Sequence, residues 1–170
     1  MIDIKKLTSR YAVRYLDDSD AEDILNLCLG NPQFYTHTAA RPEREEIQND
    51  MRMTPPGTDP SAKHYIGFFR ERDLVAVMDL IDGYPRSETA YIGFFMVNPL
   101  YQGQGTGTAI ISEAADYLRE IGKTTIRLAI DKGNPQSSCF WEKNGFSVIA
   151  EADVNGWTKC IAERSLLIPE

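Results

Sequence analysis

The segment "VNPLYQGQGTGTAI", residues 97–110, places Gly103, Gly105 and Gly107 between a strand-like run and a helix-like run. Each glycine inside regular structure costs roughly 0.5–1 kcal/mol relative to alanine. A chain accepts that cost where the backbone bends sharply or where a ligand approaches it closely. A helix that begins at such a turn directs several unpaired N–H groups at one point, so the segment predicts an anion-binding turn between a strand and a helix.

Two common phosphate-binding motifs do not fit this segment. The Walker loop needs a Lys after its last glycine, whereas Gly107 is followed by Thr108. The dinucleotide fingerprint needs the spacing Gly-x-Gly-x-x-Gly, which these glycines do not have. The sequence therefore disfavours a P-loop protein and a Rossmann dinucleotide-binding protein.

Length and composition indicate one domain. The chain has 170 residues, of which 42% are hydrophobic and 25% charged, so we expect a single domain over residues 1–170. A formal net charge of −7 disfavours nucleic acid as a partner, because a nucleic-acid binder needs a basic face. No apolar run approaches the roughly 18 residues of a membrane span, and residues 1–10 lack the apolar core of a signal peptide. We therefore expect a cytoplasmic protein with no membrane partner.

The cysteines agree with a reducing compartment. Cys28, Cys139 and Cys160 are odd in number and lack the spacing of metal ligands. A disulfide framework and a zinc site are therefore disfavoured, and reduced thiols are expected.

Apolar periodicity and turn residues predict the remaining elements. Apolar residues at helical spacing from Ile110 to Ile121 predict a helix that Gly122 ends. Before the glycine segment we expect a strand at 11–17, helices at 18–32 and 41–53, and an antiparallel meander at 64–70, 74–81 and 89–97. Pro42 is expected in the first turn of the second helix. After the glycine segment and its helix we expect a strand at 124–130, a helix at 134–145 and a closing hairpin at 146–151 and 157–164.

The pattern Gln102-x-x-Gly105-x-Gly107 resembles the acetyl-CoA pyrophosphate loop of the GNAT superfamily of N-acetyltransferases. The segment "NPQSSCFWEKNGF", residues 134–146, is similar to the family's second cofactor segment, in which an Asn opens a helix that ends in an aromatic residue, an acid, a Lys and Gly-Phe. Asn134 and Gly145 also have purely structural readings, as the N-cap and C-cap of that helix. The expected order of elements is the order that the family uses, so the resemblance covers roughly residues 11–164.

The resemblance implies an α+β fold in α/β/α layers, with a mixed, mostly antiparallel sheet of about seven strands and about four helices. It implies acetyl-CoA as co-substrate and no metal. Phe95, Met96 and Val97 are expected to line the acetyl and pantetheine end, with a backbone N–H near Val97 polarising the thioester carbonyl. The expected cofactor-binding residues are Phe95, Met96, Val97, Gln102, Gly103, Gln104, Gly105, Thr106, Gly107, Thr108, Asn134 and Trp141.

The sequence departs from the family at the proton donor. Many members carry a Tyr where Trp141 stands, and an indole N–H cannot usefully protonate a thiolate. Trp141 is more typical of a packing residue. Ser137 or Ser138 can assist through a hydroxyl or a bound water, or the coenzyme A thiolate leaves without an acid.

The sequence also lacks the general base that many family members carry on the fourth strand. Many members carry a Glu on the fourth strand, but residues 89–95 include Tyr91 and no acid. We select Asp79, a lone acid in an apolar strand, because burying an unpaired carboxylate is costly and a functional site repays such a cost. Its alternative roles are to lie on the wetter face of the sheet or to pair with a basic neighbour. Asp82 and Glu88 lie nearby at the turn.

Other candidate side chains are weaker. His37 and His64 sit in or beside loops and can serve as bases, although solvated surface histidines are the simpler interpretation. Cys139 has no His close in sequence, which disfavours an acyl-enzyme and favours a core position. The acceptor pocket is expected from the loops at 31–37 and 54–64, where Phe34 and Tyr35 can line it and bind a cationic amine.

The sequence therefore predicts an N-acetyltransferase that moves an acetyl group from acetyl-CoA to a primary amine of a small molecule or peptide, by direct attack in a ternary complex. A homodimer is compatible with this prediction. The absent Tyr and Glu leave open a catalytically silent acyl-CoA-binding or sensing module. A third hypothesis is an interaction domain that binds another nucleotide through the same loop.

Overall fold

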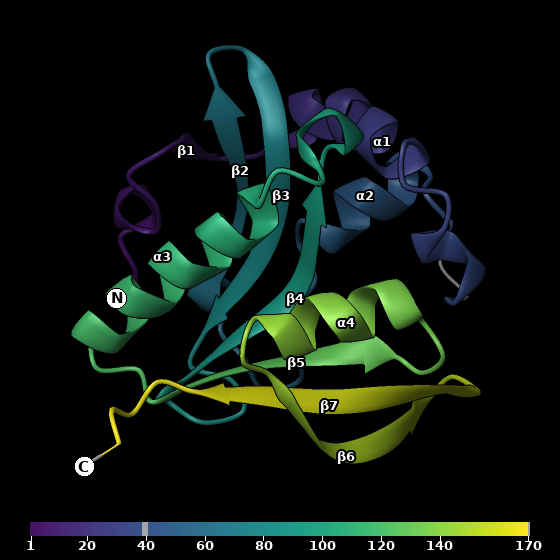
Figure 1. Ribbon diagram of the computed structural model, residues 1–170. Coiled ribbons are helices and arrows are strands. Elements are labelled where there is room, and N and C mark those ends of the chain that lie inside the picture. Colours follow the sequence, from purple (N-terminus) through teal and green to yellow (C-terminus); the bar gives the residue numbers. More distant parts are fainter. Residues whose placement is uncertain (39–40, 170) are drawn as a thin grey trace.

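The computed structural model describes residues 1–38 and 41–169. Its centre is a seven-stranded sheet in the order β1-β2-β3-β4-β5-β7-β6 (Figure 1). Neighbouring strands are antiparallel except β4 and β5, which are parallel. The strands are β1 (Ala12–Tyr15), β2 (Lys63–Arg70), β3 (Asp73–Asp82), β4 (Thr89–Val97), β5 (Thr125–Asp131), β6 (Ser147–Val154) and β7 (Trp157–Ser165).

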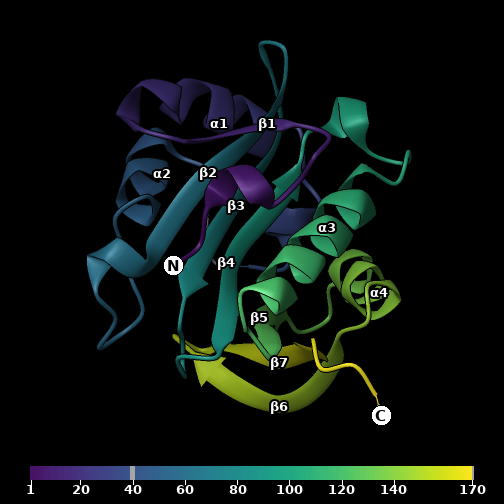
Figure 2. The same cartoon turned by 90° about the vertical axis from the view of Figure 1, so that its left-hand side faces the viewer.

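Helices cover both faces of the sheet, as Figure 2 shows. The α-helices are α1 (Ala21–Leu29), α2 (Arg44–Asp50), α3 (Thr106–Glu120) and α4 (Pro135–Lys143). The pair α1 and α2 lies on one face, and α3 and α4 lie on the other. This arrangement confirms the α+β fold in α/β/α layers and the mostly antiparallel sheet expected from the sequence.

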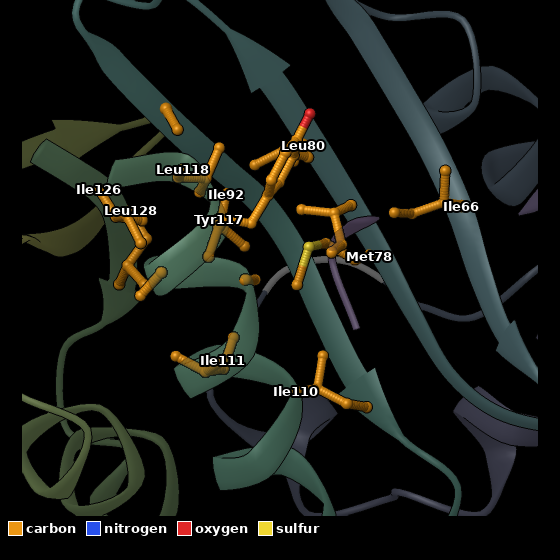
Figure 3. Close-up of a cluster of buried hydrophobic side chains, with 14 of the residues drawn as sticks. Ile66, Met78, Leu80, Ile92, Ile110, Ile111, Tyr117, Leu118, Ile126 and Leu128 are labelled. Atoms are coloured by element: carbon orange, nitrogen blue, oxygen red, sulfur yellow. The ribbon is translucent and has the colours of Figure 1, made fainter. Parts of the chain in front are cut away.

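Each face of the sheet has its own hydrophobic core. The side of α3 and α4 contains the larger cluster, in which Ile110, Ile111 and Leu118 of α3 pack on Met78 and Leu128 of the sheet (Figure 3). The side of α1 and α2 contains a smaller cluster around Ile24, Ile47 and Val77. A sheet buried on both faces explains the nearly continuous apolar runs of its central strands.

The local signals in the sequence place most helix ends correctly. The Asn134 side chain accepts a hydrogen bond from the N–H of Ser137 and caps α4, as expected. Gly122 and Gly145 follow α3 and α4 with positive φ, which glycine adopts without strain. The predicted place of Pro42 is wrong, because α2 begins at Arg44 and Glu43 is its N-cap residue.

The sheet opens in the middle. β4 and β5 pair only from Thr89 and Thr125 to Ile92 and Leu128, and beyond that point they diverge. The divergence begins beside a β-bulge, since Asp79 of β3 faces Phe94 and the next residue, Leu80, faces Ile92. Gly93 is thus the extra residue of the bulge, and a bulge bends its strand and increases the local twist. A V-shaped opening follows between the two strands.

Candidate active site

The N-terminus of α3 presents unpaired backbone donors. Its N-cap, Gly105, has φ +76°, and within the described residues no side chain caps the helix or places an acid in its first turn. The N–H groups of Thr106, Gly107 and Thr108 belong to this first turn and have no intrahelical acceptor. The helix dipole adds positive potential at the same point. The site fits a phosphate or pyrophosphate group.

A cavity of about 490 Å³ runs from this helix end into the opening between β4 and β5. Its walls come from both faces of the sheet, with Phe140 and Trp141 on the α4 side and Phe34 on the α1 side. Such a volume lies in the usual range for small-ligand and cofactor sites. The cavity therefore connects the anion site to the face where the acceptor is expected.

Most of the expected cofactor residues line this cavity. They are Phe95, Met96, Val97, Gln102, Gly103, Gly105, Thr106, Gly107, Thr108 and Trp141. Gln104 and Asn134 are not among its lining residues. The Gln104 side chain donates to the Leu100 carbonyl, and Asn134 is buried as the cap of α4. Their expected contribution to binding stays a prediction.

The Gln102 side chain has a structural partner. Its Nε2 donates to the carbonyl oxygen of Val97 at 2.8 Å and to the Asn31 side chain at 2.6 Å. These bonds tie the glycine loop to β4 and to the end of α1. The loop is therefore held in place before any ligand binds.

The two serines differ in position. Ser137 lines the cavity, and its Oγ accepts a hydrogen bond from Asn134 Nδ2 at 3.1 Å, so its own hydroxyl proton can still be donated. Ser138 does not line the cavity. Ser137, and not Ser138, therefore lies in the cavity wall, and its expected part in the departure of the thiolate stays a prediction.

Trp141 is an aromatic packing centre. It is buried, and its ring centroid lies 4.9 Å from that of Phe140 and 5.0 Å from that of Phe146. Phe95 of β4 lies against the same cluster, with 5.9 Å between ring centroids. These contacts favour the packing role expected for Trp141.

Asp79 is mostly buried and is paired. Its Oδ2 accepts a hydrogen bond from Lys63 Nζ at 2.8 Å, and within the described residues no partner is found for its buried Oδ1. Burial raises the pKa of Asp79, and the Lys63 ammonium opposes that rise. Asp79 does not itself line the cavity, although it lies behind Gly93, which does. The pairing that we considered as an alternative role for Asp79 is present, and its part in catalysis stays a prediction.

The other carboxylates near the turn are less suited to act as bases. Asp82, the last residue of β3, forms an ion pair with Lys123. Glu88 is on the surface and forms an ion pair with Arg86. Neither residue lines the cavity. Asp79 is therefore the carboxylate of this group that lies nearest to the opening between the strands.

Only one of the two expected acceptor loops reaches the cavity. Asn31 and Phe34 line it, and the Phe34 ring packs edge-on against Phe94. Tyr35 packs in the smaller core instead, and burial raises its pKa. No described residue of the loop at 54–64 lines the cavity, and the expected part of this loop in the acceptor pocket stays a prediction.

The structure adds groups that the sequence did not indicate. Asp131 at the end of β5 and Lys159 at the start of β7 both line the cavity and form an ion pair at 2.8 Å. Gly93 was also missed, although an isolated glycine inside a strand pattern is a signal for a bulge or a close approach. No pattern in the sequence joins Asp131 to Lys159, which are distant along the chain.

Two side-chain expectations are wrong. His64 is buried, not solvated, and its Nδ1 is 2.7 Å from the Tyr15 hydroxyl, while burial lowers its pKa. Cys139 is exposed on α4 and does not belong to the core. The helix turns its apolar side, with Trp141, toward the sheet, and this leaves Cys139 facing outward.

Two negative findings concern the described residues alone. No group of three or more His, Cys, Asp and Glu side chains is arranged to hold a metal ion among them. None of their helices combines the length and the apolar character needed to cross a bilayer. The expectation of metal-free chemistry stays a prediction.

Comparison with curated proteins identifies related sequences. The mycothiol acetyltransferase of Beutenbergia cavernae is 28% identical over 141 residues, which cover 81% of this chain and 46% of that protein. The curated relatives are longer than this chain, which spans between 21% and 46% of their length. The relationship therefore concerns one part of those proteins.

Solved structures share the fold over nearly the whole chain. An acetyltransferase from Thermus thermophilus superposes with a TM-score of 0.70 at 20% identity, covering 91% of this chain and 96% of that one. PaiA N-acetyltransferase from Thermoplasma acidophilum, solved in complex with coenzyme A, gives 0.64 at 19% identity and covers 91% and 98%. Residues 22–146, which include the glycine loop and the α4 segment, match the acetyltransferase (GNAT) family. The chain belongs to that family.

Proposed function

We propose that this protein transfers an acetyl group from acetyl-CoA to a primary amine by direct attack in a ternary complex. The observation that carries the proposal is the continuous cavity, which joins the N-terminus of α3 to Phe34 on the opposite face of the sheet. Both substrates can therefore occupy one cavity from opposite faces, the thioester between β4 and β5 and the amine beside α1.

The α3 N-terminus would hold the pyrophosphate, and the opening between the strands would hold the pantetheine arm. Asn98 donates its N–H to Val75 on β3, so strand alternation directs the N–H of Val97 to the open side. That N–H can donate to the thioester carbonyl oxygen as negative charge develops there. Support for this step comes from the Val97 carbonyl, which also faces away from β3 and binds Gln102.

The reaction needs a neutral amine and a base. The amine nitrogen attacks the carbonyl carbon, the C–S bond breaks, and the amine proton passes to Asp79 directly or through a water. The thiolate leaves with its electron pair, and the Ser137 hydroxyl or a water can donate a hydrogen bond to it. This assignment rests on the place of Asp79 behind Gly93 and of Ser137 in the cavity wall.

The acceptor belongs to the class of cationic amines in this proposal. Phe34 and Phe94 line the cavity and pack edge-on, so they offer aromatic faces to an acceptor. Aromatic faces attract an ammonium ion by cation–π contacts. The acceptor's identity, small molecule or peptide, is what an amine panel would decide.

A second candidate is a catalytically silent acyl-CoA-binding module. Trp141 stands where many relatives have the Tyr that serves as general acid, and Asp79 already forms an ion pair with Lys63. These two observations favour binding without chemistry. A module of this kind would bind acetyl-CoA and coenzyme A and release no thiol.

Two measurements test these alternatives. Calorimetry with acetyl-CoA, coenzyme A and ATP decides whether the protein binds a coenzyme A nucleotide. Tight binding of ATP alone would instead favour an interaction domain that binds another nucleotide through the glycine loop. A thiol-release assay over a panel of primary amines and peptides then tests for transfer. Amine-dependent thiol release supports the proposal, and tight acetyl-CoA binding with no release supports the silent module.

Location and assembly are also part of the proposal. Cys28, Cys139 and Cys160 are free thiols, which supports a reducing compartment such as the cytoplasm. A homodimer remains compatible with the fold, and sedimentation of the purified protein measures it. Neither property bears on the cavity described above.

A further inference from the structure

Asp79 lies against the one glycine of the β4 bulge. A Cβ atom added at Gly93 would lie 2.7 Å from Asp79 Oδ2, a distance that real Cβ atoms do not show. Gly93 also lines the cavity. The carboxylate therefore lies next to a cavity-lining residue that has no side chain, at the point where β4 leaves β5.

Lys63 binds Oδ2, the carboxylate oxygen that also lies nearest Gly93. Its side chain is 6% exposed and that of Asp79 is 14% exposed, and the two lie on neighbouring strands with 2.8 Å between Nζ and Oδ2. Such a pair is costly to bury, and replacing it with apolar residues is often neutral or stabilising. A pair retained at the edge of a ligand cavity therefore suggests a role besides stability.

The Lys63 pair leaves the other carboxylate oxygen without a partner. Asp79 Oδ1 is buried and has no hydrogen-bond partner among the described residues. Buried carboxylate oxygens are ordinarily satisfied, and an unsatisfied one calls for a missing donor such as a water or a ligand. A water between the acceptor and Asp79 would be such a donor.

We propose that Lys63 is a positioning residue for acetyl transfer: it holds the Asp79 carboxylate by Oδ2 beside Gly93, in the orientation in which Asp79 receives the acceptor's proton through a water. The inference rests on the proposed function, because it assigns a partner to the base named there. Lys63 itself contacts neither substrate. It sets both the orientation of the carboxylate and its charge.

The electrostatic surroundings of Asp79 come from several elements. Lys63 and Tyr65 face it from β2, Tyr91 from β4 and Asp50 from α2. Among these groups the Lys63 ammonium favours the ionised carboxylate, whereas Asp50 and burial oppose it. Loss of Lys63 therefore raises the pKa of Asp79 further and keeps the carboxyl protonated to a higher pH.

The first test is the pH dependence of kcat for Lys63→Met and Lys63→Arg. The acidic limb of the pH–rate profile is the range in which kcat falls as pH drops. We expect Lys63→Met to move this limb upward by at least one pH unit and to lower kcat at pH 7 at least tenfold, with recovery at higher pH. Lys63→Arg keeps the charge and should restore the parental limb. Acetyl-CoA affinity, measured by calorimetry, should change less than threefold in both variants.

Lys123→Met is the matched control. Lys123 also forms a buried ion pair with an aspartate of β3, Asp82, with exposed side-chain fractions of 11% and 18%. That pair lies at the far end of the strand and outside the cavity. Lys123→Met should lower the melting temperature and leave the acidic limb in place. An equal shift of the limb in both Met variants overturns the proposal.

A second test asks whether Lys63 acts through Asp79. In an Asp79→Ala background, Lys63→Met should cause no further loss of kcat, whereas independent roles would make the two losses multiply. Should Lys63→Met fail to fold, Lys63→Gln removes the charge and keeps an amide donor, and the same shift is expected. If the parent is active and neither Lys63→Met nor Lys63→Gln moves the acidic limb of the pH–rate profile, the positioning role of Lys63 is overturned and the proposed function stands. A parent that binds acetyl-CoA and acetylates no amine overturns the proposed function, and this role with it.

Discussion

Gly107 of α3 packs directly against Phe140 of α4. A Cβ atom added at Gly107 would lie 3.1 Å from the Phe140 ring and 3.3 Å from Val97. This contact is tight enough that any side chain must displace its neighbours. A substitution at Gly107 therefore also disturbs helix packing, and Gly105, which has open space around its Cβ position, is the cleaner probe of ligand approach.

Gly105→Ala should weaken acetyl-CoA binding at least tenfold. The added methyl group would stand where the pyrophosphate approaches the N–H groups of α3, while the positive φ costs roughly 1 kcal/mol of stability. Gly122→Ala is the control, because Gly122 ends the same helix with φ +90° and open space, away from the cavity. Calorimetry checks both. Equal affinities of the two folded variants for acetyl-CoA would contradict the assignment of the glycine loop as the pyrophosphate site.

Trp141→Phe should leave the turnover rate within a few-fold of the parent. Phenylalanine retains most of the contacts with Phe140 and Phe146, and no proton transfer is assigned to the indole. Steady-state kinetics at saturating acetyl-CoA measures the effect. A loss of about a thousandfold with intact acetyl-CoA affinity, far beyond what lost packing explains, would give Trp141 a direct part in the chemistry.

Asp79→Asn should lower kcat by about 10² to 10⁴, the range typical of general-base loss. Because Asp79 must be ionised to accept a proton and burial raises its pKa, the parental rate falls as pH drops through a pKa above the ordinary Asp range. The Asn variant should lose that acidic limb. A pH–rate profile of both proteins checks this.

Two other outcomes of Asp79→Asn have different meanings. A rise in the acceptor's KM that high amine concentration overcomes would show that Asp79 only attracts the cation. A lower melting temperature with an unchanged acidic limb would make Asp79 a structural partner of Lys63. Either result passes the base role to another group, such as Glu88, a histidine or an ordered water.

Asp20→Asn should reduce the free energy of unfolding at pH 7 by about 1.5–3 kcal/mol. Asp20 accepts hydrogen bonds from both terminal nitrogens of Arg14, at 2.8 and 2.9 Å, and these bonds lower its pKa. The stabilisation is therefore complete above the unfolded pKa near 3.8 and is lost as pH falls through the lower folded pKa.

Denaturant titrations at several pH values check this prediction. The control is Asp18→Asn, since the pair of Asp18 with Arg52 is exposed on both sides and should contribute about 0–1 kcal/mol. The difference between Asp20→Asn and the parent should shrink below pH 3.8. A constant difference at all pH values would show that the charge of Asp20 contributes nothing.

The glycine turn and the uncapped N-terminus of α3 could be predicted from sequence because all of their parts are local. The glycines, the turn and the first turn of α3 are consecutive residues, so their geometry follows from backbone preferences alone. The same holds for Asn134 and Gly145 at the ends of α4. The order of elements followed from apolar periodicity, which reports burial along each segment and requires no knowledge of its neighbours.

The ion pairs in and near the cavity were decided by tertiary structure. Asp79 meets Lys63, and Asp131 meets Lys159, only after antiparallel strands align in register. The burial of His64 and the exposure of Cys139 likewise depend on which face each element turns to the sheet. A one-residue change in register would turn each strand side chain to the opposite face. The sequence alone thus determined the elements and the glycine turn before α3, whereas the charge partners and the opening beside Gly93 arose from long-range strand pairing, which local preferences do not encode.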